Sequence, residues 1–255
     1  MCQLLAMNCN VPTDICFSFT GFQARGGATD VHRDGWGIAF FEGRGVRIFL
    51  DPRPSCESQV AELVRRYPIH SLNVIAHIRK ATQGLVLLEN CHPFTRELWG
   101  RYWAFAHNGD LKDFAPTLSG PFRPVGTTDS ELAFCHLLNH LHERFDSVPS
   151  TADLASALGE LTPAIAAHGS FNYMLSDGDA LFAHCSTHLH YLVRQYPFAI
   201  AKLSDEDMSV DFSQVTAQRD RVAIIVTEPL TANETWTAFK PGELKVFVGG
   251  EPLIV

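Results

Sequence analysis

Short apolar runs that predict β-strands occupy both ends of this chain, and the helical patterns lie between them. The predicted strands cover 4–7, 36–41, 46–50, 72–78, 102–107, 171–175, 180–184, 189–193, 221–226 and 244–248. Helical spacing occurs at 58–66, at 129–145 and at 151–169, where Pro163 is expected to interrupt the helix. Strands and helices that are grouped in this way do not alternate as βαβ units do. The chain therefore predicts an α+β fold with two antiparallel-rich sheets in a single domain over residues 1–255.

Composition limits the classes of function. The 255 residues are 46% hydrophobic and 19% charged, with a formal net charge of -8. An acidic surface argues against a nucleic-acid partner and against an anionic membrane. The sequence contains no secretory signal and no apolar run long enough to span a membrane. Seven cysteines without any CxxC pair favour reduced thiols, so a cytoplasmic location is expected.

Two motifs at the ends of predicted strands could bind a substrate. In "YWAFAHNGDL" (102–111) the strand is expected to end at Asn108 and Gly109. This pair is typical of a hairpin turn, but an Asn amide and a Gly N–H can also form two convergent donors for an oxyanion. In "AHIRKATQG" (76–84), Arg79 and Thr82 could hold a carboxylate, although a surface arginine at a strand end is the simpler interpretation.

Two further motifs are weaker when taken alone. "GTTDSE" (126–131) is typical of a helix cap, in which Asp129 could also accept hydrogen bonds from an ammonium group. The glycine-rich stretch 23–41 contains Arg25 and Arg33, either of which could reach a site; the other interpretation is a flexible loop. The polar stretch 202–220 predicts a surface excursion.

Two other enzyme classes compete for the cysteines and histidines. His136, His140 and His142 with Glu143 resemble a metal cluster, but no HExxH or HxxEH spacing is present, and "HLH" (188–190) is only a weak lead. We therefore predict no metal site. A papain-like protease would place its cysteine at the start of a helix, whereas Cys2 precedes a predicted strand.

The order of the motifs is more specific than any one of them. Cys2, RGG, DGWG, HIRKATQG, NCHPF (90–94), HNG and TDSE follow one another, with a weaker echo at 225–236. This order resembles the class II, N-terminal-nucleophile glutamine amidotransferases, and in particular their stand-alone branch, which includes γ-glutamyl hydrolases of ergothioneine and glutathione metabolism. The resemblance implies a four-layer αββα sandwich, the N-terminal-nucleophile hydrolase fold, with no cofactor.

The resemblance also implies catalytic roles. Cys2, exposed as the N-terminus once Met1 is removed, would attack the γ-amide carbonyl of glutamine or of a γ-glutamyl compound and form a γ-glutamyl thioester. The freed α-amine would accept the thiol proton, because its pKa of about 7.7–8.0 is close to that of a thiol, about 8.5. Asn108 and Gly109 would form the oxyanion hole.

The remaining implied roles concern the amino-acid head of the substrate. Arg79, with Thr82 beside it, would bind the α-carboxylate, Asp129 would bind the α-ammonium group, and Arg25 would lie near the nucleophile. Lys80 and Gln83 depart from the pattern of many synthase-linked relatives, so the leaving group need not be ammonia.

Two functions remain open at this stage. The first is an amidohydrolase or amidotransferase that acts alone or supplies ammonia to a separate synthase subunit. The second is a catalytically inactive or partner-activated subunit of the same fold that binds glutamine. No nucleic-acid or membrane partner is expected for either function.

Overall fold

The computed structural model describes residues 2–82 and 84–253, and every strand pairing in this part of the chain is antiparallel. A seven-stranded sheet has the spatial order β13 (Thr237–Ala238), β9 (His190–Arg194), β12 (Val222–Val226), β1 (Gln3–Thr13), β4 (Ser71–Ile78), β2 (Trp36–Glu42) and β3 (Gly45–Asp51). A six-stranded sheet has the order β15 (Glu251–Leu253), β14 (Glu243–Val248), β8 (Leu181–Cys185), β7 (Gly169–Ser176), β6 (Arg101–Leu111) and β5 (Phe94–Leu98).

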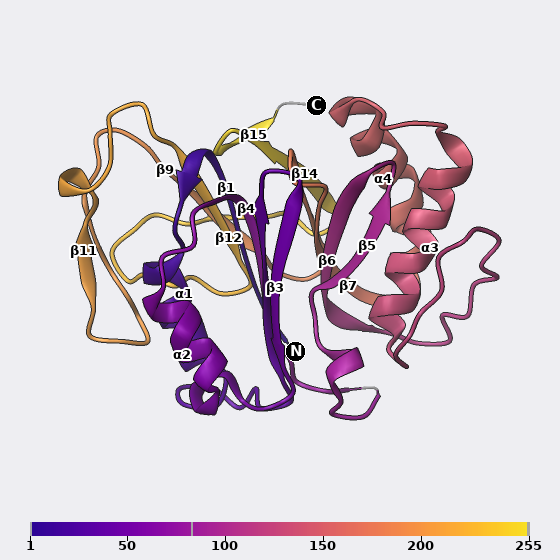
Figure 1. The fold of residues 1–255 in the computed structure, drawn as a ribbon, viewed down its shortest axis with the longest axis horizontal. Helices are drawn as coiled ribbons and strands as arrows, with labels where there is room; N and C mark the ends of the chain where they lie inside the picture. Colours follow the sequence, from indigo (N-terminus) through magenta and orange to yellow (C-terminus); the bar gives the residue numbers. More distant parts are fainter. Residues whose placement is uncertain (1, 83, 254–255) are drawn as a thin grey trace.

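Helices cover the outer face of each sheet. The helices are α1 (Cys16–Ala24), α2 (Gln59–Arg66), α3 (Asp129–Arg144) and α4 (Thr151–Ala166), with 3-10 turns η1 (Ser55–Glu57), η2 (Leu88–Asn90) and η3 (Phe212–Gln214). In Figure 1, α1 and α2 lie on the left of the two sheets, and α3 and α4 lie on the right. The predicted four-layer αββα sandwich of two antiparallel sheets is confirmed.

The first half of strand β1 contains a run, residues 4–7, that is apolar at every position. Leu5 and Met7 pack into the core under α1 and α2, whereas Leu4 and Ala6 pack into the core between the two sheets. Successive side chains of a strand point to opposite faces, so a strand that is buried on both faces needs apolar residues at every position. The run at the start of the chain therefore fixes β1 in the middle of the sandwich.

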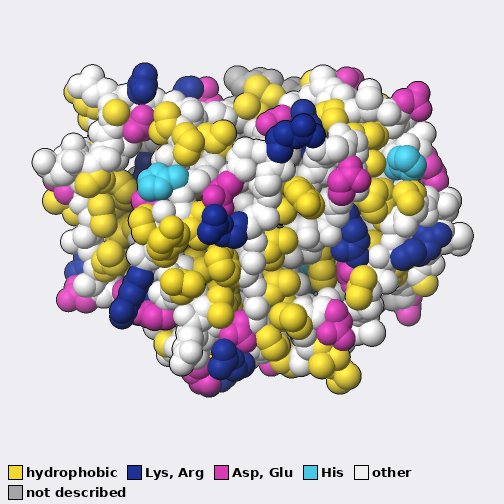
Figure 2. Space-filling view, viewed as in Figure 1, with side chains coloured by type: hydrophobic (Ala, Val, Ile, Leu, Met, Phe, Trp, Pro, Cys, Tyr) yellow, Lys and Arg dark blue, Asp and Glu magenta, His cyan; other side chains and the backbone are white. Residues whose placement is uncertain are grey.

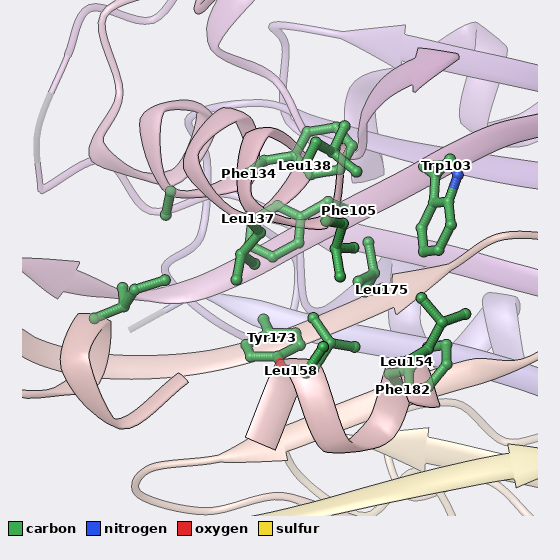
Figure 3. Packing of buried hydrophobic residues seen from close by; sticks show 14 of the residues in the cluster. Trp103, Phe105, Phe134, Leu137, Leu138, Leu154, Leu158, Tyr173, Leu175 and Phe182 are labelled. Atoms are coloured by element: carbon green, nitrogen blue, oxygen red, sulfur yellow. The ribbon is translucent and has the colours of Figure 1, made fainter. Parts of the chain in front are cut away.

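A third core lies between the six-stranded sheet and helices α3 and α4 (Figure 3). Phe134, Leu137, Leu138 and Leu141 of α3 are fully buried there, as their helical spacing predicts. The ring of Phe134 stacks on Phe105 of β6 with centroids 5.1 Å apart. The side chain of Thr128 caps the helix by accepting the N–H of Glu131, which confirms the predicted helix cap.

Two local expectations were wrong, and one helix was not predicted. Strand β6 continues through Asn108 and Gly109 to Leu111, so this pair makes no hairpin turn. Helix α4 runs through Pro163, which lies in its last turn, where a missing N–H costs only one hydrogen bond. Helix α1 was not predicted, because Phe17–Ala24 are all buried and the segment shows no alternation between polar and apolar faces.

The polar stretch 202–220 leaves the sandwich as predicted. Strands β10 (Ile200–Lys202) and β11 (Ser209–Asp211) form a separate two-stranded sheet, which projects on the left of Figure 1. On the face seen in Figure 2, Lys and Arg side chains are scattered among acidic ones and form no continuous basic patch. Within residues 2–82 and 84–253, no helix is both long and apolar enough to cross a membrane.

The Phe105–Phe134 stack gives a test of the third core. Replacing Phe134 with Ala should lower the free energy of unfolding by about 3–5 kcal/mol, because a fully buried ring is lost and a cavity remains. Urea denaturation would measure the loss. Val125→Ala is the control, since this side chain is 79% exposed and its truncation should change stability by less than about 0.5 kcal/mol. A loss below 1 kcal/mol for Phe134→Ala would contradict the packing described here.

Candidate active site

Cys2 lies immediately before β1, where the strand begins to pair with β4 through Gln3 and Ile78. Its side chain is buried, and Sγ lies 3.3 Å from the backbone N of Lys80 and 3.4 Å from the Lys80 carbonyl oxygen. Burial raises the pKa of the Cys2 thiol, while the Lys80 N–H and the charge of Arg79 oppose this effect. The thiol form is therefore favoured, and a base is needed to make it reactive.

Asn108 lies on β6 of the other sheet and has no exposed surface. Its amide nitrogen lies 3.4 Å from the hydroxyl oxygen of Thr227, and the same hydroxyl oxygen accepts the N–H of Leu4 at 2.9 Å. Thr227 therefore connects the strand that follows Cys2 to the side chain of Asn108. The amide oxygen Oδ1 of Asn108 is buried without a hydrogen-bond partner in the part of the chain that the structure describes.

Gly109 presents its N–H on the side of β6 that β7 does not cover. Its partner on β7 is Phe171, whose N–H donates to Ser186 Oγ at 2.9 Å and whose carbonyl accepts from His184 Nδ1 at 2.7 Å. Phe171 thus uses its backbone groups away from β6, which makes Gly109–Phe171 a non-hydrogen-bonded pair. A Cβ on Gly109 would lie 1.7 Å from the Ser170 carbonyl oxygen, so no side chain fits at this position.

Backbone contacts from the DGWG motif hold Arg79. The Arg79 N–H donates to the Gly35 carbonyl at 2.8 Å, and the Arg79 carbonyl accepts from Asp34 at 3.1 Å. The carboxylate of Asp34 also accepts the N–H of Ala81 at 2.8 Å. The guanidinium of Arg79 is buried and donates to the Leu85 carbonyl at 3.0 Å, which keeps the 84–90 loop close to it. Gly35 has a φ of 108°, a conformation that favours glycine.

Asp129 is the first residue of α3, and its partly exposed carboxylate faces the end of β6. Its Oδ2 accepts the Leu111 N–H at 2.8 Å. Asp129 and Arg79 both lie close enough to Cys2 to act on its thiol pKa, Arg79 lowering it and Asp129 raising it. The structure thus brings together Cys2, Arg79, Asp129 and, through Thr227, Asn108 with Gly109.

The NCHPF motif connects two of these segments. The amide of Asn90 donates to the Leu85 carbonyl at 3.0 Å, and its oxygen accepts the Thr127 N–H at 2.9 Å. The loop after Arg79 and the loop before Asp129 are therefore held by one side chain.

Arg25 and Thr82 occupy different surroundings from the other predicted site residues. The guanidinium of Arg25 is buried and paired with Asp205 at 2.7 Å, and it also donates to the carbonyls of Glu228 and Pro229. These contacts tie the glycine-rich loop to the 202–220 excursion. Thr82 is exposed, and its role remains a prediction. Met1 and Gln83 lie outside the described residues.

Thr227 is the residue that the motif analysis did not single out. It belongs to the weak echo at 225–236, and only its contacts with Leu4 and Asn108 connect it to the site. A threonine directly after a buried strand gives no local signal, so the sequence could not have identified it.

The histidine clusters do not form a metal site in the described part of the chain, where no group of three His, Cys, Asp or Glu side chains could hold an ion. The His140 ring nitrogen Nδ1 is hydrogen-bonded to the His136 carbonyl, and His190 Nδ1 donates to the Thr227 carbonyl at 3.0 Å. Cys2 precedes a strand and not a helix, which is inconsistent with a papain-like site.

The four-layer arrangement of two antiparallel sheets, with Cys2 directly before a central strand of one sheet and Asn108 on the other, defines an N-terminal-nucleophile fold. The family model described as "Glutamine amidotransferases class-II" matches residues 1–255. The chain is 52% identical over 255 residues to "Putative glutamine amidotransferase YafJ" of Escherichia coli, which covers 100% of both proteins. The chain therefore belongs to the class II glutamine amidotransferases.

Solved structures agree with this assignment. A crystal structure described as a "predicted glutamine amidotransferase" from Pseudomonas aeruginosa is 49% identical, with a TM-score of 0.81 over 99% of this chain and 100% of that chain. Glutamine phosphoribosylpyrophosphate amidotransferase of Bacillus subtilis is 14% identical, with a TM-score of 0.50 over 98% of this chain and 48% of that chain. At that identity the second likeness shows the fold alone. The resemblance inferred from the order of the motifs is confirmed.

Three buried histidines close to the site give the stability a pH dependence. Burial lowers the pKa of His77 and His92 well below its usual value, and it also lowers that of His107. In the unfolded chain each of these imidazoles binds a proton near pH 6.5, whereas in the folded chain it stays neutral at this pH. The stability that comes from burying the neutral imidazoles is therefore complete above about pH 6.5. It is lost as the pH falls from there toward the pKa of the folded state. We expect the free energy of unfolding to fall by up to roughly 1.4 kcal/mol per pH unit for each buried imidazole.

Urea denaturation between pH 7.5 and 5.5 at constant ionic strength would measure this dependence. His92→Phe should make the free energy of unfolding depend less steeply on pH, because one buried imidazole is lost. His142→Gln, at an exposed position, should leave this dependence unchanged. A stability that stays constant over this range would contradict the prediction.

Proposed function

We propose that this protein hydrolyses the γ-amide of glutamine or of a γ-glutamyl compound, with Cys2 as the nucleophile. The observation that supports this most is the position of the buried Cys2 thiol, which lies near Arg79 and Asp129 and is linked through Thr227 to Asn108. A thiol, two oxyanion donors and a charged pair for an amino-acid head are the parts that this reaction needs.

The reaction starts once Met1 is removed and the α-amine of Cys2 is free. The neutral amine accepts the thiol proton as Sγ bonds to the γ-carbonyl carbon, and the carbonyl oxygen becomes an oxyanion held by Asn108 and Gly109. When the oxyanion collapses, the C–N bond breaks, and the leaving nitrogen takes the proton from the α-ammonium group. A water then attacks the γ-glutamyl thioester, which releases glutamate and restores the thiol.

The charged pair explains the choice of a glutamyl group. Arg79 binds the α-carboxylate as a fork of two donors, and Asp129 accepts from the α-ammonium group, with Thr82 and Arg25 as further predicted contacts. A substrate without the head group makes no contact with either charged side chain, which disfavours its binding.

Several properties of the whole protein belong to this proposal. We expect one catalytic domain over residues 1–255, a cytoplasmic location and, for an ammonia-donating role, a separate synthase subunit. The absence of any CxxC pair among the seven cysteines of the sequence supports a reducing compartment. The second candidate is a glutamine-binding subunit that is inactive alone, which the burial and raised pKa of Cys2 would favour if Met1 were retained.

Glutamate release tests the nucleophile. Mass spectrometry would measure glutamate formed from L-glutamine and from a panel of γ-glutamyl amides, after intact-mass analysis has shown that Met1 is absent. Cys2→Ala should abolish release, because no thioester can form. Release from glutamine alone indicates an amidotransferase subunit, and preference for a larger amide indicates a hydrolase. No Cys2-dependent release from any substrate would refute the proposed activity for the isolated chain.

Arg79→Lys tests how the head group is bound. The lysine keeps the charge but loses the two-donor fork, so KM for the best substrate should rise roughly tenfold or more, with a smaller change in kcat. Arg47→Lys is the control, because Arg47 pairs with Glu42 on the surface and should leave KM unchanged. An equal KM in the Arg79→Lys and wild-type proteins would show that Arg79 does not bind the carboxylate.

A further inference from the structure

Thr227 occupies the junction between the two sheets at the site. It follows β12, its N–H donates to the Leu4 carbonyl at 3.1 Å, and its hydroxyl oxygen accepts the Leu4 N–H at 2.9 Å. The Thr227 carbonyl accepts from His190 Nδ1 at 3.0 Å. Thr227 is 3% exposed, so these contacts hold its hydroxyl in a buried position beside Leu4. Leu4 is only two residues from Cys2 in the sequence.

The hydrogen bonds of Asn108 are incomplete in the observed amide orientation. Its amide nitrogen lies 3.4 Å from the hydroxyl oxygen of Thr227, which is a long distance for a hydrogen bond. That oxygen already accepts the N–H of Leu4. Asn108 Oδ1 is buried and lacks a partner among the described residues. An unpartnered acceptor in this direction cannot stabilise an oxyanion, and leaving it buried costs free energy.

Turning the amide by half a revolution about its Cβ–Cγ bond reverses both groups without changing the space that they fill. Oδ1 then faces the hydroxyl of Thr227, which has one proton to donate, and the NH₂ group takes the direction of the unpartnered oxygen. Oδ1 of Asn108 and the hydroxyl of Thr227 are then both satisfied, and the NH₂ group is left to donate to the substrate oxyanion.

We propose that Thr227 is a positioning residue for the reaction: its hydroxyl donates to Asn108 Oδ1 and thereby selects the amide orientation that presents NH₂ to the oxyanion. This inference rests on the proposed function of Cys2 and Asn108. It also makes the same hydroxyl a contact of the Cys2 strand, so the nucleophile and the donor are positioned by one side chain.

The kinetic test compares Thr227→Val, which keeps the shape but removes the hydroxyl, with Thr227→Ser, which keeps the hydroxyl. We expect kcat for the best substrate to fall roughly tenfold to a hundredfold in the Val variant, since one oxyanion donor is misoriented, and KM to change less than about threefold. The Ser variant should stay within about threefold of wild type in kcat.

Thr231→Val is the matched control. Thr231 is also a buried threonine after β12, but its hydroxyl bonds to Glu234 and Trp236, away from Cys2 and Asn108. Its kcat should match that of wild type. An equal loss of kcat in Thr231→Val and Thr227→Val would overturn the proposal, and so would a Ser variant as impaired as the Val variant. Should Thr227→Val fail to fold, Thr227→Ala takes its place as the variant without a hydroxyl. Its kcat is then compared with that of Thr227→Ser in the same way.

A binding measurement separates positioning from simple damage to the site. The Cys2 thiol adds to the aldehyde carbon of open-chain L-glutamate γ-semialdehyde, and its proton passes to the former carbonyl oxygen. This oxygen of the hemithioacetal takes the place of the oxyanion; L-glutamate forms no such adduct. Loss of the Thr227 hydroxyl should lower the affinity for the aldehyde by the same factor by which it lowers kcat. The affinity for glutamate should stay within about threefold of wild type. Equal weakening of both ligands would overturn the proposal.

The two proposals can fail separately. Absence of Cys2-dependent glutamate release from the wild-type protein would refute the proposed function. The aldehyde measurement would still decide the role of Thr227, because adduct formation needs only the thiol and the oxyanion donors. A Cys2→Ala protein should bind the aldehyde no more tightly than glutamate.

Discussion

The site depends on the burial of β1 on both of its faces. Hydrogen bonds to β4 and β12 fix the strand laterally, and apolar side chains fill a core on each side of it. A strand held in this way cannot slip by one residue without exchanging the contents of two cores. Its register therefore sets the position of Cys2, which lies directly before the first paired residue. Pairing of Gln3 with Ile78 of β4 fixes the residue that follows Cys2.

Loops around this fixed point are held by buried polar contacts and not by apolar packing. Asp34 and Gly35 hold the backbone of Arg79, and Asn90 links the loop after Arg79 to Thr127. Each contact joins a motif to another that is distant in the sequence. The segments around DGWG, HIRKATQG, NCHPF and GTTDSE are thus joined to one another by hydrogen bonds in the fold.

Some buried polar groups near the site have no partner among the described residues. These include Asn108 Oδ1 and both ring nitrogens of His92, whose ring centroid lies 4.1 Å from that of His77. Unpaired polar groups in a core cost stability, so they are expected where function and not packing determines the residue. Asn108 fits this explanation through the oxyanion role proposed for it. The structure offers no comparable account of the His77–His92 pair.

The sequence alone determined the strand-rich α+β class, most of the strands, the caps and face of α3, and the motif residues, because apolar periodicity and capping are local properties of the chain. It misjudged Asn108–Gly109 as a strand end, since local turn propensity is weaker than pairing with β7. It also missed α1, whose burial on all sides removes the amphipathic pattern. Only the tertiary structure placed Thr227 beside Asn108, 119 residues away on the other sheet. Long-range hydrogen bonds of this kind leave no periodicity in the sequence, because they depend on how two sheets stack.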